Sequence, residues 1–158
     1  MDAALLARLR AEAFLAEYVH VLDGGRLEEW AGLFTADGRY KVVTRDNHEL
    51  GLPLAVMSCD GQGMMRDRIS ALRTANVFEP HVYCHVPGAL RVLEHGNGTI
   101  RTESTFAVFR TMGDGTMSLF ACGRSQDRLV EHAGTLRLAE RVVILDSRQI
   151  DTLMVIPL

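Results

Sequence analysis

The sequence predicts an α+β roll, in which N-terminal helices pack on a strongly curved antiparallel sheet. Three observations support this prediction. Apolar residues recur at helical spacing in the first third, apolar and polar residues alternate in the last half, and glycine-bearing turns separate the alternating runs. With 158 residues and an apolar content of 47%, the chain can enclose one core, so we expect a single domain over residues 1–158.

The first helix is predicted by an apolar stripe over residues 7–22. Its members fall at i, i+4, i+7 and i+11 and are Ala7, Ala11, Phe14 and Tyr18. Gly24-Gly25 should end this helix, because glycine accepts the left-handed conformation common at helix C-termini. A short second helix should follow, with one apolar face made of Leu27, Trp30, Leu33 and Phe34.

The middle of the chain combines a strand, a helix and an extended segment. Asp37-Gly38 is typical of a turn and precedes a first strand over residues 39–44. Residues 60–75 are predicted to form a helix whose apolar side carries Met64, Met65, Ile69 and Leu72. Pro80 and Pro87 bracket a segment that should be extended, since proline disfavours helix at its own and the preceding position.

The last half is predicted to be a meander of long antiparallel strands. Alternating runs cover 89–93, 99–111, 116–130 and 135–145, and the turns between them carry Gly96-Asn97-Gly98, Gly113-Asp114-Gly115 and Ala133-Gly134. In the second run Ile100, Phe106 and Val108 should share one face, and the opposite face should carry Arg101, Glu103 and Thr105. Such strands twist strongly, and the helices can cover the apolar face.

Composition excludes several classes of function. A formal charge of −3 argues against a nucleic-acid partner, which requires a concentrated basic surface. The three cysteines, Cys59, Cys84 and Cys122, form neither a CxxC zinc pair nor an even disulfide framework, so we expect reduced thiols. Charged residues interrupt the apolar N-terminus, and no run approaches the length of a membrane span. We therefore expect a cytoplasmic protein without a membrane partner.

A group of histidines is the densest set of side chains that could carry chemistry. In an extended segment one side would carry His81, Tyr83 and His85, and the other would carry Val82, Cys84 and Val86. Two histidines without a third ligand nearby make an incomplete metal site. Hydrogen-bonded histidines at an interface or a sheet edge are the favoured interpretation, with catalysis as the alternative.

General acid–base chemistry is a further possibility. A roll can enclose a pocket in which one carboxylate and one histidine transfer a proton. The candidates are Asp37, Asp46, His48, Asp60 and Asp67, although capping or solvated carboxylates are the simpler interpretation.

Two segments indicate contacts within the domain or with a neighbour. Arg66-Asp67-Arg68 should form ion pairs of either kind. If it were exposed, the apolar tail over residues 151–158 would promote nonspecific association, so it should pack on its own domain or on a partner.

An ordered series of short motifs resembles the small, or beta, subunit of aromatic-ring-hydroxylating dioxygenases over nearly the whole chain. In the first half these are Leu33-Phe34, Gly38-Arg39-Tyr40, Asn47-His48, Gly51-Leu52-Pro53-Leu54 and Met65-Arg66-Asp67-Arg68-Ile69. In the second half they are Glu79-Pro80-His81 with His85, Arg110-Thr111-Met112, Phe120-Ala121, Asp127-Arg128, Glu140-Arg141, Asp146-Ser147-Arg148 and Asp151-Thr152-Leu153. The stretch from Asn47 to Leu54 is most similar to relatives that act on benzoate-type acids such as terephthalate, anthranilate or salicylate. The chain departs from the family pattern between His81 and His85, where arginines are commoner, and at Ser125, where an aromatic residue is more usual.

The resemblance implies a cystatin-like, NTF2-like roll that assembles as a ring of three beneath three large (alpha) subunits. In the family the large subunit holds a Rieske [2Fe–2S] cluster and a mononuclear iron, and a reductase or ferredoxin supplies its electrons. This sequence is consistent with iron centres that lie in the large subunit, because a Rieske centre needs paired Cys and His ligands and no Cys-x-His pair occurs here. We therefore expect no cofactor, no metal and no catalytic residue in this chain.

Two hypotheses follow from these observations. The first is a structural, non-catalytic subunit of a Rieske oxygenase that hydroxylates an aromatic acid for catabolism. Its expected subunit-interface residues are Arg66, Asp67, Arg68, His81, Tyr83 and His85. The alternative is a stand-alone isomerase or dehydratase of the same roll, and a small-molecule binding module is a third possibility. The interior of the roll discriminates between them, because an enzyme or a binding module needs an open pocket there.

Overall fold

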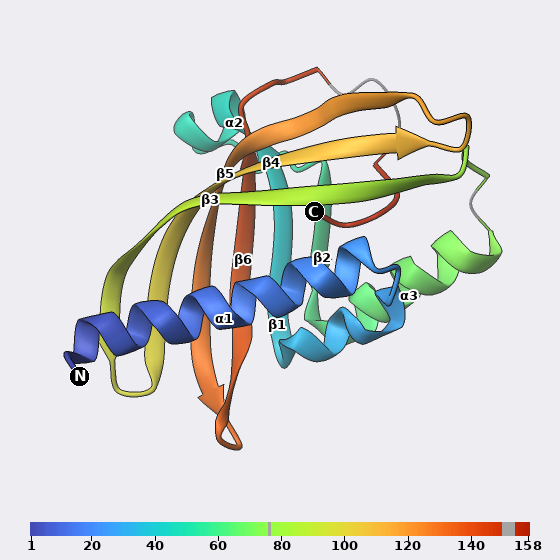
Figure 1. Ribbon diagram of the computed structural model, residues 1–158. Helices are drawn as coiled ribbons and strands as arrows, with labels where there is room; N and C mark the ends of the chain where they lie inside the picture. Colours follow the sequence, from blue (N-terminus) through green and yellow to red (C-terminus); the bar gives the residue numbers. More distant parts are fainter. Residues whose placement is uncertain (76, 150–153) are drawn as a thin grey trace.

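In the described residues, 1–75, 77–149 and 154–158, a computed structural model shows a curved six-stranded sheet and three α-helices (Figure 1). The first part of the chain forms α1 (Ala3–Asp23), 3₁₀ turns at Leu27–Glu29 and Ala31–Leu33, β1 (Phe34–Thr44), α2 (Arg45–Glu49), β2 (Met57–Asp60) and α3 (Gly61–Thr74). The second part forms β3 (His81–Gly96), β4 (Thr99–Met112), β5 (Met117–His132) and β6 (Thr135–Leu145). The predicted α+β roll is confirmed.

Helix α1 crosses the concave face of the sheet (Figure 1). The Asp2 side chain caps its start by accepting a hydrogen bond from the Ala4 backbone N–H at 3.3 Å. Just beyond its end, Gly25 adopts a φ of 72°, in the left-handed region that glycine favours. The buried stripe includes Ala7, Ala11 and Tyr18. Both the stripe and the glycine stop match the prediction.

Strands β3 to β6 form the predicted meander, in which each strand runs antiparallel to the next. The β3–β4 turn places Asn97 and Gly98 at φ values of 50° and 73°, and two such residues are what a tight type I′ hairpin requires. On β4, Ile100 and Val108 are buried while Arg101 is exposed, so the predicted alternation holds. The long hairpins give the sheet its curvature.

The sheet is mixed, because β1 runs parallel to β6, whereas β3 to β6 are antiparallel as predicted. The strand order is β2-β1-β6-β5-β4-β3. After β1 and β2 the chain passes through α3 to β3 at the opposite edge of the sheet, and the following strands lead back until β6 lies beside β1. The predicted helix over residues 27–34 is replaced by two 3₁₀ turns, and Phe34 already begins β1. Asp37-Gly38 lies at a register shift inside that strand rather than in a turn.

The interior of the roll is filled by aromatic rings and by the end of the chain. Tyr18, Trp30, Phe34 and Tyr40 pack edge to face, with centroid distances from 5.0 to 6.5 Å. The hydroxyls of Tyr18 and Tyr40 donate to the backbone carbonyl of Leu158 at 2.8 and 3.1 Å. Residues 154–158 are buried, so this part of the tail packs on its own domain, whereas residues 151–153 lie outside the described residues.

Candidate functional site

A buried ion pair joins β5 and β6 on the concave face of the sheet. Arg141 donates to both carboxylate oxygens of Asp127, at 2.9 and 2.8 Å, and its guanidinium lies 4.4 Å from the centroid of the Tyr18 ring. The Asp127 side chain is 0% exposed. Burial raises the pKa of Asp127, and Arg141 opposes that shift. Burial also raises the pKa of Tyr18 to about 12. These groups therefore bind one another and hold the sheet and α1 together.

A second buried polar pair links the end of α1 to β3. Asp23 accepts two hydrogen bonds from His85, one from ring Nδ1 at 2.6 Å and one from the backbone N–H at 2.8 Å. A histidine held in this way by a carboxylate has the arrangement of a general base, with Nε2 as the acceptor. Here Nε2 is buried and has no hydrogen-bond partner among the described residues. The surrounding side chains close it off, so a substrate does not reach this base in the conformation described.

Strand β3 places the three predicted residues His81, Tyr83 and His85 on its concave side, as the alternation predicted. Tyr83 and His85 are buried, and the Tyr83 ring stacks on Phe120 with a centroid distance of 5.2 Å. His81 is half-buried, and its Nδ1 donates to the backbone carbonyl of Glu79 at 2.8 Å. Both histidines are hydrogen-bonded on an edge strand, as the favoured interpretation predicted.

Helix α3 carries the other predicted residues. Arg66 is exposed and donates to the Gln62 side chain at 2.9 Å, and Asp67 is exposed as well. Arg68 is half-buried beside Cys59, where it partly offsets the upward effect of burial on the pKa of that thiol. Because α3 packs on β1 and β2, while β3 forms the opposite edge of the sheet, the structure keeps this group apart from His81, Tyr83 and His85.

The acid–base candidates named from the sequence do not enter the interior. The exposed set comprises Asp37, Asp46, His48, Asp60 and Asp67. The interior instead holds Asp23, Asp127 and Arg141, which the sequence reasoning missed. Alternation along β5 is the signal that could have found Asp127, because it falls in phase with the buried Ser125 and Leu129.

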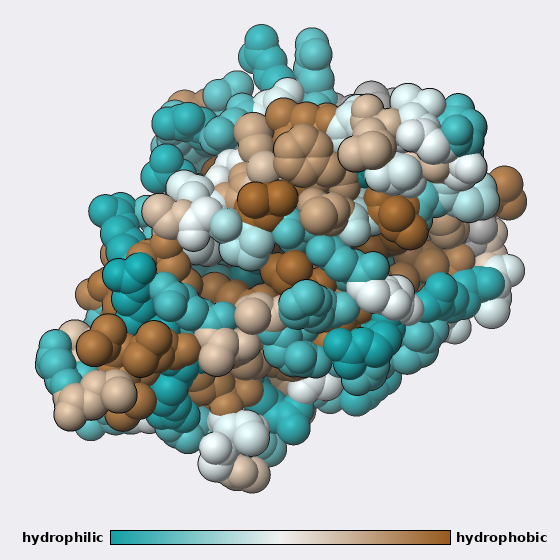
Figure 2. All heavy atoms as spheres, viewed as in Figure 1, coloured by the Kyte–Doolittle hydropathy of each residue, from teal (hydrophilic) through white to brown (hydrophobic). Residues whose placement is uncertain are grey.

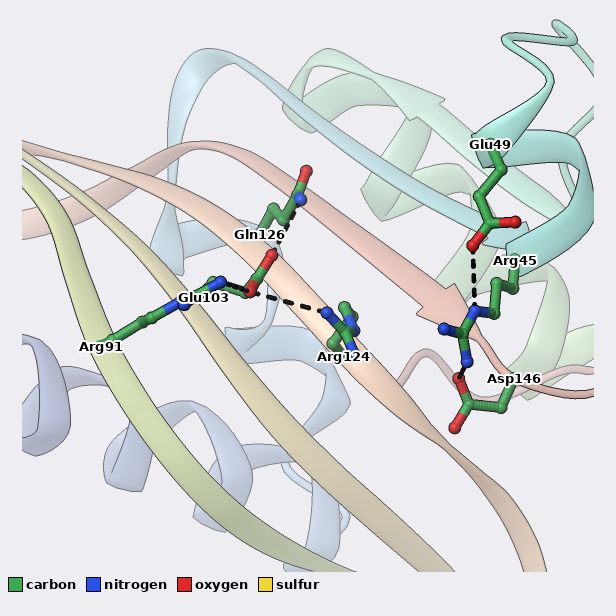
Figure 3. Close-up of polar contacts among 7 residues, drawn as sticks. All are labelled: Arg45, Glu49, Arg91, Glu103, Arg124, Gln126 and Asp146. Atoms are coloured by element: carbon green, nitrogen blue, oxygen red, sulfur yellow. Dashed lines mark hydrogen bonds and ion pairs between the residues drawn. The ribbon is translucent and has the colours of Figure 1, made fainter.

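The convex face of the sheet carries a network of charged side chains (Figure 3). Glu103 accepts hydrogen bonds from Gln126 at 3.1 Å and Arg91 at 2.7 Å, and Arg124 lies 3.7 Å away. The hydrogen bond from Gln126, followed by that from Arg91, lowers the pKa of Glu103. Beyond this network a groove of about 660 Å³ runs beneath α2, with Lys41 among the residues that line it.

Among residues 1–75, 77–149 and 154–158, no three His, Cys, Asp or Glu side chains gather into a group that could hold a metal ion. Within the same ranges, none of the helices has the length and apolar character needed to cross a bilayer.

The fold and the whole length of the chain match known proteins. Residues 3–142 match the family model of the SnoaL-like domain. The chain is 40% identical over 155 residues to subunit beta 1 of the terminal oxygenase component of terephthalate 1,2-dioxygenase from Comamonas, which covers 98% of this chain and 100% of the relative. The chain belongs to this family of dioxygenase beta subunits.

Two other members of the family agree with this assignment. The small subunit of anthranilate 1,2-dioxygenase from Burkholderia cepacia is 36% identical over 141 residues, covering 89% of this chain and 88% of the relative. A crystal structure from Novosphingobium aromaticivorans, assigned as the beta subunit of an aromatic-ring-hydroxylating dioxygenase, superimposes with a TM-score of 0.90. It is 37% identical, and the match covers 99% of this chain and 100% of that one.

Proposed function

We propose that this chain is the structural, non-catalytic beta subunit of a Rieske oxygenase that hydroxylates an aromatic acid. The observation that carries the proposal is the full-length likeness to beta and small subunits of the terephthalate and anthranilate dioxygenases. The filled interior of the roll supports it, because its charged groups are engaged with one another and the Nε2 atom of His85 is closed off. The stand-alone isomerase or dehydratase would need an open pocket inside the roll, and the described interior is filled by side chains. The groove that His48 and Asp60 line lies on the convex face instead.

In this proposal the chain acts by positioning its partner. The large subunit carries the Rieske [2Fe–2S] cluster and the mononuclear iron, and a reductase or ferredoxin supplies electrons to it. A ring of three copies, each one domain over residues 1–158, holds the large subunits in register in the cytoplasm. Electron transfer from one subunit's cluster to a neighbour's iron depends on that register.

The six expected interface residues divide into two groups by exposure. Arg66 and Asp67 are exposed, and Arg68 and His81 are half-buried, so all four can touch a partner directly. Tyr83 and His85 are covered almost completely by this chain, so we propose that they shape the β3 surface from beneath. Arg68→Ala combined with His85→Ala should weaken association with the large subunit, whereas Arg8→Ala, on the exposed side of α1, should not. An unchanged elution volume of the co-expressed double variant in size-exclusion chromatography would count against these contacts.

The non-catalytic role has its own test at His85, whose geometry most closely approaches that of a general base. We expect His85→Gln complexes that elute at the normal mass to hydroxylate the aromatic acid within a few-fold of the wild-type rate. A loss of about 100-fold in kcat, with mass and iron content unchanged, would place catalysis in this chain instead.

A further inference from the structure

The groove of about 660 Å³ on the convex face of the sheet lies beneath α2 and the segment that follows it. Side chains of β1, β2, β5 and β6 form its floor, and Leu52, Pro53 and Ala55 give it an apolar wall. Asn47 and His48 of α2 add polar groups to the same wall. Small-molecule sites in proteins have volumes of about 300–1,000 Å³, with apolar walls and a few polar groups. This groove therefore has the size and the lining of such a site.

Lys41 of β1 lies on the floor of the groove. Strand alternation places its side chain on the opposite face from that of the buried Tyr40. The register sets Lys41 between Val142 of β6 and Ser58 of β2, and neither of these neighbours carries a charge. Lys41 is half-buried, and it is the one lysine among the 17 basic residues of the chain, since all the others are arginines.

The arginines around the groove are bound to carboxylates, whereas Lys41 is not. Arg39 pairs with Glu140 at 2.8 Å across the floor. The outside of α2 is largely hydrophilic (Figure 2), and there Arg45 lies 3.6 Å from Asp146 (Figure 3). Within residues 1–75, 77–149 and 154–158, no carboxylate lies within ion-pair distance of Lys41. The groove therefore offers an ammonium group whose charge the described part of this chain leaves unbalanced.

The acidic side chains of the floor lie beside Arg39 rather than Lys41. In the register Arg39 is flanked by Glu140 on β6 and by Asp60 on β2. These carboxylates repel an anion from that row, so an anion that enters the groove is directed to Lys41. A lysine ammonium group forms charge-assisted hydrogen bonds to a carboxylate, and these are stronger than bonds between neutral groups. The apolar wall beside it requires that the rest of the ligand be apolar.

We propose that this groove binds a small aromatic carboxylate, with its carboxylate on Lys41 and its ring against Leu52 and Pro53. The groove itself calls for an anion with an apolar body, and the choice of an aromatic one rests on the proposed function. The relatives are named as dioxygenases of terephthalate and anthranilate, which are both aromatic acids. A ligand that binds the folded chain stabilises it, so the site would make the stability of this subunit respond to the acid.

Because Lys41 is the only lysine, its amine can be observed by itself in the full chain. Reductive methylation with ¹³C-formaldehyde keeps the positive charge and labels Lys41 together with the N-terminal amine, which serves as the internal control. We expect a titration with benzoate to shift the Lys41 signal to saturation and to leave the terminal signal in place. Lys41→Arg removes the labelled signal and so assigns it. A Lys41 signal that stays in place throughout the titration would overturn the proposal.

Calorimetry of the unmodified chain measures the affinity for benzoate. Lys41→Met should weaken binding at least 10-fold, whereas the matched control Arg101→Met should leave it unchanged. Arg101 is an exposed cation of the same sheet face outside the groove, so both variants lose one positive charge, and melting curves should confirm that both fold. Acetate lacks the ring and benzamide lacks the charge, so each should bind at least 10-fold more weakly than benzoate. Equal affinity for acetate, or equal losses in the two variants, would contradict the proposed site.

Other results distinguish this site from the proposed function. If benzoate does not bind and Lys41→Met instead releases the large subunit, the proposal is overturned and Lys41 contacts a carboxylate of that partner. If an iron-bearing partner co-purifies with a chain that does not bind benzoate, the site is refuted and the proposed function stands. Benzoate binding by a chain that recruits no iron-bearing partner would contradict the proposed function and leave the site standing.

Discussion

Replacing Arg141 by methionine removes one half of the ion pair buried between β5 and β6. Arg141 donates to Asp127 at 2.9 and 2.8 Å and lies over the ring of Tyr18. Methionine keeps much of the packing but leaves a carboxylate in the core without its counter-charge. Breaking a buried pair in this way costs about 3–5 kcal/mol. That is a large share of the roughly 5–15 kcal/mol that stabilises a typical domain.

The cost should depend on pH, because Asp127 can become neutral. Burial raises the pKa of this carboxyl in the folded chain, and Arg141 is the group that opposes the shift. A carboxyl with a raised folded pKa contributes its full stability below its unfolded value, about 3.9, and loses it as the pH rises through the folded pKa. Relative to wild type, Arg141→Met should therefore be least destabilised near pH 4. Above that pH its free energy of unfolding should fall by up to about 1.4 kcal/mol per pH unit, until Asp127 ionises.

Urea denaturation of the chain at several pH values between 4 and 7 measures this cost directly. The control is Asp127→Leu combined with Arg141→Met, which removes both charges and should recover most of the lost stability, since apolar replacement of a buried pair is often neutral. A loss that does not vary with pH, or a double variant no more stable than Arg141→Met alone, would refute the reasoning.

Three further predictions concern the sheet and the aromatic core. Glu103→Gln should destabilise the chain at neutral pH and cease to do so towards pH 3. The pKa of Glu103 is lowered in the folded chain, so its ionised form stabilises the fold at pH values above the pKa in the unfolded chain, about 4.3. That contribution is lost as the pH falls through the folded pKa, and urea denaturation at each pH would show the loss. Gly123→Ala should cost about 1–3 kcal/mol in thermal melts, because a methyl group there would overlap a backbone carbonyl of β6. Gly32→Ala, which has open space, should be close to neutral. Tyr18→Phe should cost about 1–3 kcal/mol in the same melts, since the Trp30 indole N–H loses its acceptor.

The elements that the sequence predicted well are those set by neighbouring residues. The glycine stop after α1, the buried side of α3 and the hairpin at Asn97-Gly98 depend on spacing and on backbone freedom within a few residues. On α3 the prediction was wrong for Met64, which is exposed, while Met65, Ile69 and Leu72 are buried. The alternation on β3 correctly separated the side of His85 from the side of Cys84. The family resemblance, carried by many short motifs in order, agreed with the full-length relatives.

The features that escaped prediction join residues far apart in the sequence. The parallel pairing of β1 with β6 brings Tyr40 beside Arg141, and no local pattern encodes that return of the chain. Asp23 and His85 are separated by 62 positions, so their hydrogen bond exists only once α1 lies across the sheet. Leu27 to Phe34 has helical spacing, yet 3₁₀ turns and a strand take its place where the chain turns into β1.

The central claim is that this chain works as the structural subunit of an iron-bearing oxygenase. The most direct measurement is affinity purification of the tagged chain from its native host grown on an aromatic acid, with iron and acid-labile sulfide assayed in the eluate. Our account predicts a stoichiometric large partner that carries both. A metal-free homo-oligomer without that partner would contradict it.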